Sequence, residues 1–246
     1  MPRDFSTEAI VLGSHRLREA DRIVTLFTLD RGKVPTVVKG VRKVSSRFGG
    51  RLEPFTYLRV SLHEGRSLHT LTSADTIRTH AASRDHPAAL KAGLSFINLL
   101  ARETNDLEGR PRTYNLLVRF LDELDRLVKS SSAPACLPLL ALSADLKLLL
   151  LAGYLPLLDN CPLCGRNIEA PARFSAAAGG AICNECRGDA FPLSVTALTT
   201  MEMLLKQPLS AVPKITIDSG TAREVWRAIR EICLYHLGID LKIAPV

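Results

Sequence analysis

The first 80 residues contain short apolar runs separated by turn residues, a pattern typical of β-strands. Between residues 55 and 62, Leu58, Val60 and Leu62 alternate with polar positions, so they are expected to face a core while Tyr57 and Arg59 face outward. Five strands are predicted, at about residues 6–12, 22–28, 34–41, 55–62 and 67–74. Since closure removes exposed strand edges, the count predicts a five-stranded OB-fold barrel over residues 1–80.

After residue 81 the apolar period becomes helical. Helices are predicted at about residues 87–105, 113–129 and 135–151, and the last is apolar on most sides, which is typical of a buried helix. Ser194 is a predicted N-cap for a helix ending near Lys206. Thr221 and Glu224 form a predicted capping box for a final helix that ends at Gly238. The fold class is therefore α+β, with a barrel followed by an all-α domain over residues 81–246.

Four cysteines form two CxxC pairs, Cys161 with Cys164 and Cys183 with Cys186, separated by eighteen residues. Two such turns direct four thiolates at one centre, which suits zinc or an iron–sulfur centre, zinc being the commoner occupant. Four thiolates leave no open coordination position, so one structural Zn²⁺ per chain is predicted, in a four-cysteine zinc ribbon or finger at about residues 155–190. Cys136 and Cys233 lie in apolar helical patterns and are expected in the core.

The formal charge is +7 and the pI is near 9.3, which favours a polyanionic partner. Residues 1–79 carry fourteen Lys and Arg against eight Asp and Glu, so the excess is concentrated there. No secretory signal and no apolar run of about 18–20 residues is present. CxxC pairs without a signal indicate a reducing compartment, so a cytoplasmic, nucleoid-associated protein is expected, with no membrane partner and no small-molecule substrate.

The segment between Asp30 and Glu53 contains no acidic residue. Its cations would follow the phosphates of single-stranded DNA with little base readout, and seven contacts would give log K a salt slope of about −5. Phe48 lies among them, either stacking on bases or packing in the core. The predicted DNA-binding residues are Arg31, Lys33, Lys39, Arg42, Lys43, Arg47, Phe48 and Arg51.

These strings resemble the RecO family, in its zinc-bearing branch. The resemblance is carried by KGVRK at 39–43, SRFGG at 46–50, LEPF at 52–55, ADRIVTLFT at 20–28, the approach to the first CxxC at 155–164, and 236–242. It implies a non-enzymatic mediator of the RecF pathway that binds single- and double-stranded DNA and anneals complementary strands. It also implies action with RecR to load RecA onto DNA coated by single-strand-binding protein.

The resemblance further implies that the helical domain docks the acidic C-terminal tail of single-strand-binding protein. A basic residue beside an apolar groove is needed there, and Lys206, Arg223 and Arg227 are the candidates.

Two other interpretations remain. A nuclease would need clustered carboxylates, whereas Asp21, Asp30, Asp75 and Asp85 are scattered, and no catalytic residue is predicted. A zinc-ribbon factor acting on duplex DNA or RNA is the second alternative. Gly32 and Lys33 stand without the rest of a phosphate-binding loop, so any annealing is expected to need no ATP.

Overall fold

The computed structural model describes residues 4–17, 19–41, 46, 48–105, 107–130, 136–168 and 172–242. Its contacts divide the chain into two compact units. The first comprises residues 1–93 and 104–129, and the second comprises residues 94–103 and 130–246. The helices at residues 81–85 and 111–129 lie after the predicted boundary at residue 80, and both therefore belong wholly to the barrel unit. Within the described residues no helix is both long enough and apolar enough to cross a membrane.

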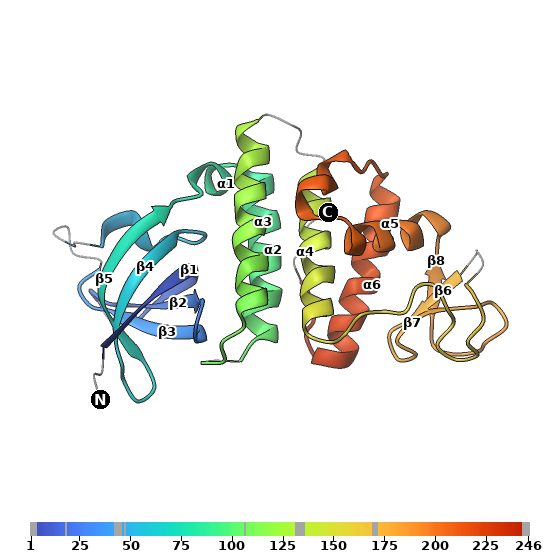
Figure 1. Ribbon diagram of the computed structural model, residues 1–246, viewed down its shortest axis with the longest axis horizontal. Coiled ribbons are helices and arrows are strands. Elements are labelled where there is room, and N and C mark those ends of the chain that lie inside the picture. Colours follow the sequence, from blue (N-terminus) through green and yellow to red (C-terminus); the bar gives the residue numbers. More distant parts are fainter. Residues whose placement is uncertain are drawn as a thin grey trace. The chain divides into compact units, whose positions relative to one another are not determined.

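Five strands of the first unit close into a barrel in the order β1-β2-β3-β5-β4 (Figure 1). They are β1 (Asp4–Arg16), β2 (Arg22–Thr28), β3 (Gly32–Val38), β4 (Tyr57–His63) and β5 (His69–Arg78). The parallel pairing of β3 with β5, in which Thr36 lies opposite His69, completes the circle. The predicted five-stranded OB-like barrel is confirmed, and β1 and β5 extend several residues beyond the predicted runs because polar residues continue both strands.

The barrel interior is filled by alternate apolar side chains of its strands, including Val24, Leu26, Leu58, Val60 and Leu62. The short helix η1 (Gly49–Leu52) adds to the core through Leu52, which is 1% exposed. This burial of aliphatic side chains from every strand is the main stabilising contribution to the unit.

Tyr57 lies on the outer side of the barrel, as its alternation with Leu58 predicts, but it is only 9% exposed. Tyr114 of helix α3 (Pro111–Lys129) packs edge-on against its ring, with the centroids 6.4 Å apart. The Tyr57 hydroxyl donates a hydrogen bond to Glu8. The outward face of β4 is therefore partly covered by α3, which leaves Arg59 exposed and Tyr57 unavailable for stacking on a base.

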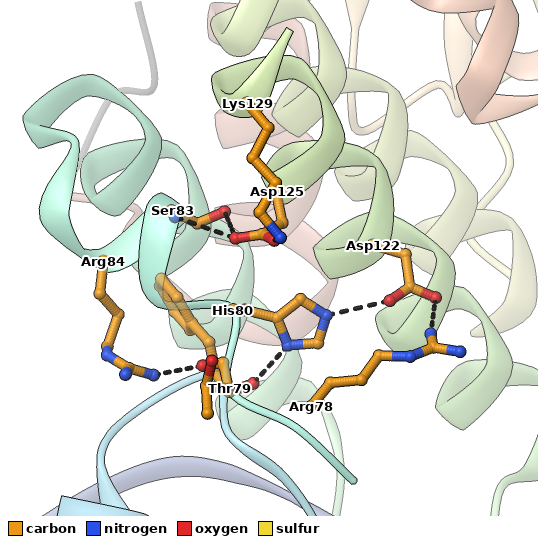
Figure 2. Close-up of polar contacts among 9 residues, drawn as sticks. Arg78, Thr79, His80, Ser83, Arg84, Asp122, Asp125 and Lys129 are labelled. Carbon is orange, nitrogen blue, oxygen red and sulfur yellow. Dashed lines mark hydrogen bonds and ion pairs between the residues drawn. The ribbon is translucent and has the colours of Figure 1, made fainter.

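Helix α3 is joined to the end of β5 through His80, which is 4% exposed (Figure 2). Its Nδ1 lies 2.8 Å from the Phe55 carbonyl oxygen and its Nε2 lies 3.0 Å from Asp122 Oδ1 on α3. Arg78 forms an ion pair with the same carboxylate. His80 has φ of +47°, a left-handed conformation that directs the chain from β5 into helix α1 (Ala81–Asp85).

A second carboxylate of α3 binds the start of α1 (Figure 2). Asp125 Oδ1 accepts hydrogen bonds from the Ser83 amide at 3.1 Å and from its hydroxyl at 3.3 Å. Lys129 lies 2.6 Å from Asp125 Oδ2, one helical turn away. Two acidic residues of one helix thus fix both the final residues of the barrel and the first turn that leaves it.

Helix α2 (Pro87–Glu103) contributes residues up to Gly93 to the first unit and the rest to the second. The second unit contains α4 (Leu137–Leu151), α5 (Val195–Lys206), η3 (Leu209–Lys214) and α6 (Ser219–Leu237). Helix α4 is buried on nearly all sides, as predicted. Two of its polar residues are used internally, since Ser143 and Lys147 both donate to the Leu204 carbonyl at the end of α5, at 2.9 and 2.8 Å.

The N-cap of α5 is confirmed, since Ser194 Oγ accepts a hydrogen bond from the Ala197 amide at 3.1 Å. The capping box predicted for α6 is wrong. Asp218 is the N-cap, accepting from the Thr221 amide at 2.9 Å, so the helix begins two residues before Thr221. Glu224 instead accepts a hydrogen bond from the Ser194 amide at 2.7 Å. A tertiary contact between α6 and the N-cap of α5 thus replaces the predicted contact within α6.

Three short strands lie between α4 and α5, in the sheet order β7-β6-β8. They are β6 (Ala172–Ser175), β7 (Gly180–Ile182) and β8 (Phe191–Leu193). Antiparallel pairing of β6 with β7 forms a hairpin, and Leu157 bonds to Gly179 and Ala181 across its end. This small sheet carries the cysteine-bearing turns.

Candidate metal centre and nucleic-acid interface

The first CxxC pair lies in a tight hairpin that precedes β6. Asn160 bridges to Asn167, and the Cys161 amide donates to the Arg166 carbonyl at 2.8 Å. Inside this ladder the Gly165 amide donates to the Cys161 carbonyl at 2.8 Å. Gly165 has φ of +74°, which a side chain would strain, and this conformation lets the chain turn directly after Cys164.

The second CxxC pair follows β7 directly, because Cys183 is the residue after Ile182. Arg173 of β6 holds this turn: its guanidinium donates to the Cys183 carbonyl at 3.4 Å and to the Cys186 carbonyl. The β6–β7 hairpin therefore sets the position of the second pair relative to the small sheet. Sequence reasoning missed Arg173, whose role depends on strand pairing.

The sulfur atoms of Cys161, Cys164, Cys183 and Cys186 all lie within 4.8 Å of one another. Among the described residues this is the one group of three or more His, Cys, Asp or Glu side chains placed to hold an ion. The Sγ atoms of Cys164 and Cys183 are 3.7 Å apart, far beyond the roughly 2.05 Å of a disulfide. The predicted convergence of both pairs is confirmed, and the cluster can bind a metal ion.

The cluster favours thiolate at some positions more than others. Burial raises the pKa of Cys161, but hydrogen bonds from the amides of Cys183, Leu163 and Cys164 outweigh it and bring the pKa to about 6. The pKa of Cys186 rises to about 12, first because of its hydrogen bonds with Cys164 and Cys183. Four sulfurs this close cannot all ionise without a cation among them, which is the charge that a bound metal supplies.

Arg166 is a further member of this centre. Its Nε lies 3.5 Å from Cys164 Sγ and its Nη2 lies 4.0 Å from Cys183 Sγ, so one guanidinium contacts a sulfur of each pair. Glu185 holds the same group through Nη1 at 2.6 Å. The contact with Arg166 lowers the pKa of Cys164. An arginine two residues after a CxxC pair is the sequence signal that could have identified it.

The described members of the predicted DNA-binding set are spread along strand β3 and the segment after it. Arg31 precedes β3, Lys33 lies near its start, and Lys39 follows its last residue, so the seven-residue strand separates them by about 20 Å. Arg42, Lys43 and Arg47 lie outside the described residues. Lys39 and Arg51 are exposed.

Arg31 and Lys33 both have partners within the barrel unit. Arg31 Nη1 lies 3.3 Å from Glu64, and its guanidinium stacks 3.7 Å from the centroid of the Phe5 ring. Lys33 Nζ donates to the Thr104 carbonyl at 2.9 Å. These contacts hold both half-buried cations to the protein. Arg51 is exposed, and its contact in the described residues is a hydrogen bond of 3.2 Å to the Ala74 carbonyl.

Phe48 is 5% exposed and belongs to the barrel core. Of its two predicted roles, the structure therefore supports packing and does not support base stacking. Its burial has a local cause, since Phe48 directly precedes η1, whose Leu52 enters the same core.

Two of the four carboxylates considered for a nuclease are engaged separately. Asp21 Oδ1 accepts from the Gly40 amide at 2.8 Å, and Asp30 Oδ2 accepts from the Thr7 hydroxyl at 2.9 Å. They bind different turns of the barrel, so neither joins a metal-binding carboxylate pair.

Of the three cations considered for the tail site, Arg227 lines a pocket. The pocket has a volume of ≈ 200 Å³ and an aromatic wall of Phe174, Phe191 and Tyr235. The Arg227 guanidinium lies 4.0 Å from the centroid of the Phe191 ring. Lys206 pairs with Glu202 at 3.0 Å, and Arg223 donates to the Ser219 carbonyl at 3.2 Å.

Comparison with known proteins agrees with this architecture along the chain. The family model "Recombination protein O N terminal" matches residues 1–80, and "Recombination protein O C terminal" matches residues 84–243. A protein described as DNA repair protein RecO from Rubrobacter xylanophilus is 34% identical over 238 residues, covering 95% of this chain and 90% of its own length.

Further relatives with the same description show similar coverage. The Nocardioides protein is 36% identical over 252 residues, covering 97% of this chain and 96% of its own, and the Desulforudis audaxviator protein is 32% identical over 238 residues, covering 96% and 92%. The barrel, the helical unit and the four-cysteine centre thus occur in a chain that matches these proteins over most of their length. The chain belongs to the RecO family, whose members are non-enzymatic DNA repair proteins that act as recombination mediators in the RecF pathway.

Proposed function

We propose that this chain binds single- and double-stranded DNA through the end of the barrel at which β3 terminates. The observation that carries the proposal is the exposure of Lys39 and Arg51, which lie at the two ends of residues 39–51, a basic stretch that contains no acid. Unlike Arg31, neither is held by a carboxylate or by an aromatic ring in the described part of the chain. Exposed cations of this kind are suited to neutralising phosphates.

DNA annealing follows from the same charge. Two complementary strands repel each other, and a cationic surface that lowers their charge density raises the rate at which they meet. We infer that the chain anneals strands without ATP. With RecR it would help RecA to load onto DNA coated by single-strand-binding protein, on the chromosome in the cytoplasm.

The metal is proposed to be one structural Zn²⁺. Zinc–sulfur bonds of about 2.3 Å place the sulfurs of a tetrahedral site about 3.8 Å apart. The distance of 3.7 Å between the sulfurs of Cys164 and Cys183 fits this value. Zinc bound by four thiolates has no open position, so it would hold the two turns together and take no part in chemistry.

Salt dependence tests the DNA proposal. Without Arg31 and Lys33, five cations remain (Lys39, Arg42, Lys43, Arg47 and Arg51), and five phosphate contacts give a slope of log K against log salt of about −3.5 on single strands. Measured by fluorescence anisotropy with an oligonucleotide, Lys39→Gln is expected to reduce the slope by about 0.7.

The matched control is Lys214→Gln, which removes an exposed lysine from the helical unit. It should leave slope and affinity unchanged. If Lys39→Gln binds with the wild-type slope, or if both variants weaken binding equally, the barrel end is not the binding surface.

For the tail of single-strand-binding protein, we propose the pocket beside Arg227. An acidic peptide that ends in an apolar residue could place its carboxylate at the guanidinium and its side chain against Phe174 and Tyr235. Asp189 and Glu231 also line the pocket, so binding would be opposed by two negative charges and favoured by one positive charge. This balance predicts a weak complex that is sensitive to salt.

Titration with a fluorescent acidic-tail peptide tests this site. Arg227→Glu is expected to weaken binding at least tenfold, because it adds a third negative charge to the pocket. Arg223→Glu, the same change one helical turn earlier on α6, is the control and should have a much smaller effect. Equal losses in the two variants would show that the peptide responds to overall charge and not to this pocket.

A further inference from the structure

Two arginines lie directly opposite each other at the free end of the β1–β2 hairpin. The strand register pairs Arg16 with Arg22, and the Leu17 amide donates to the Asp21 carbonyl at 3.1 Å to close the turn. Directly opposed residues have Cβ atoms about 4.5–5.5 Å apart, and like charges at that spacing are destabilising. The hairpin therefore carries a repulsive pair at a position where most side chains would be more stable.

A β-bulge determines which way this pair faces. Val11 lies opposite Leu26 on the core side of the sheet, but the next paired residue of β1 is Gly13, opposite Thr25. The extra residue reverses the alternation, so Arg16 projects on the same side as Arg22. Without the extra residue, the Arg16 side chain would project from the opposite face of the sheet to Arg22. Bulges commonly re-aim side chains in this manner beside binding sites.

The pair lies beside the basic segment already proposed to bind DNA. Arg22 is opposite Val38, the last residue of β3, and Lys39 follows. Asp21, next to Arg22, accepts a hydrogen bond from the Gly40 amide at 2.8 Å, which fixes the turn after β3 against the hairpin. Gly40 has φ of +65° in this turn. The turn that contains Lys39 and Gly40 is thereby anchored to the arginine pair.

One ion pair to the two arginines is present among the described residues. In the part of the chain that the structure describes, no ion pair to Arg16 is present, and its side chain is exposed. The side chain of Arg22 is 34% exposed and has one acidic contact there, Glu53 at 3.8 Å, which is near the limit for an ion pair. The carboxylate of Asp21 is engaged by a backbone amide. Among the described residues, Glu53 is therefore the one carboxylate that forms an ion pair with either guanidinium group.

We propose that Arg16 and Arg22 form a phosphodiester-binding subsite, continuous with Lys39, for the backbone of single-stranded DNA. A phosphate between the two guanidinium groups accepts hydrogen bonds from both and removes their repulsion. This inference rests on the proposed function and extends the interface to the β1–β2 hairpin, outside the segment at residues 31–51 that composition identifies.

The test compares Arg16→Gln, Arg22→Gln and the double variant with Arg66→Gln. Arg66 is exposed in the β4–β5 turn, at the opposite end of β1 from Arg16, since β4 ends at His63 opposite Asp4. Each hairpin substitution is expected to weaken oligonucleotide binding about three- to fivefold at about 0.15 M salt and to reduce the salt slope by about 0.7. Arg66→Gln should change neither.

Thermal unfolding without DNA separates binding from structure. Removing one charge of a repulsive pair should leave the melting temperature equal to or slightly above that of the wild type, whereas a structural role would lower it together with DNA affinity. Glu53→Gln is expected to strengthen binding, because it frees Arg22. Inorganic phosphate, added at constant ionic strength, should compete only weakly if a DNA backbone is the ligand.

The outcomes distinguish the two proposals. If the hairpin variants bind with wild-type affinity and slope while Lys39→Gln is impaired, the subsite is refuted and the barrel-end interface stands. A hairpin variant that binds poorly because its melting temperature has fallen also refutes the subsite. If the wild-type chain itself shows no salt-dependent binding, the proposed function fails first.

Discussion

Replacement of Cys161 by serine is expected to release the metal ion and destabilise the helical unit by several kcal/mol. Structural zinc contributes roughly 10–16 kcal/mol to the folding of isolated zinc peptides, and less here because the β6–β7 hairpin and the helices already order both turns. Cys161 is 1% exposed and close to the other three sulfurs, so serine leaves an incomplete site in a buried position. Metal analysis and thermal unfolding measure the two effects.

DNA binding should largely survive the same change, because the proposed interface lies in the other unit. Cys136→Ser is the control: this cysteine lies outside the cluster, and its variant should keep the metal. Arg166→Gln is expected to have an intermediate effect. Because Arg166 contacts the sulfurs of both pairs, its loss should reduce metal affinity about tenfold, as measured by competition with a chelator. Full metal content in Cys161→Ser would contradict the four-cysteine site.

Removal of the His80 ring is expected to destabilise the barrel unit by about 3 kcal/mol. His80→Gly leaves the Phe55 carbonyl without its partner and takes one partner from Asp122, and each buried polar group left unsatisfied costs roughly 1–3 kcal/mol. Glycine suits the left-handed backbone at this position, so His80→Ala should be worse by about 1 kcal/mol. Urea denaturation measures both.

His86→Gly serves as the control, since His86 is only half-buried and directly precedes α2, where its Nδ1 lies 3.4 Å from the Ala89 amide. Its loss should be clearly smaller than that of His80→Gly. If the two glycine variants are equally stable, the ring does not join α3 to the barrel, and the network in Figure 2 contributes little.

The same network predicts how stability depends on pH. Burial raises the pKa of Asp122, but hydrogen bonds from Arg78 and His80 together outweigh it, so the pKa lies below the ordinary value. For Asp125, Lys129 and the Ser83 amide likewise outweigh burial and lower the pKa. Because these carboxylates bind protons less readily in the folded state, their contribution is present above about pH 4 and is lost as pH falls through their folded pKa values. Urea denaturation repeated between about pH 6 and pH 3 measures this loss.

The elements of secondary structure were largely predictable because they rest on local patterns. The alternation around Leu58, Val60 and Leu62 identifies a barrel strand, and the uniformly apolar run of α4 identifies a buried helix. Ser194 was identifiable as a cap because its partner, Ala197, lies three residues away. The capping box at Thr221 was predicted wrongly for the opposite reason. Glu224 accepts a hydrogen bond from Ser194, thirty residues away, so the local motif did not describe its contact.

The candidate metal site was also predictable, since ligand type and spacing alone indicate four thiolates around one ion. The contacts that two arginines make with it were not. Arg166 reaches sulfurs of both pairs only once the hairpins are side by side, and Arg173 reaches the second turn only through strand pairing.

By itself the sequence determined that the chain has a basic barrel, a helical unit and a four-cysteine centre, because composition and period are local properties. The tertiary structure decided which cations lie close together. Strand β3 carries Arg31 away from Lys39, and the core takes Phe48. One bulged residue in β1 turns Arg16 towards Arg22. Side-chain direction in a strand changes with every residue of register, and register is fixed by packing between segments distant in the chain.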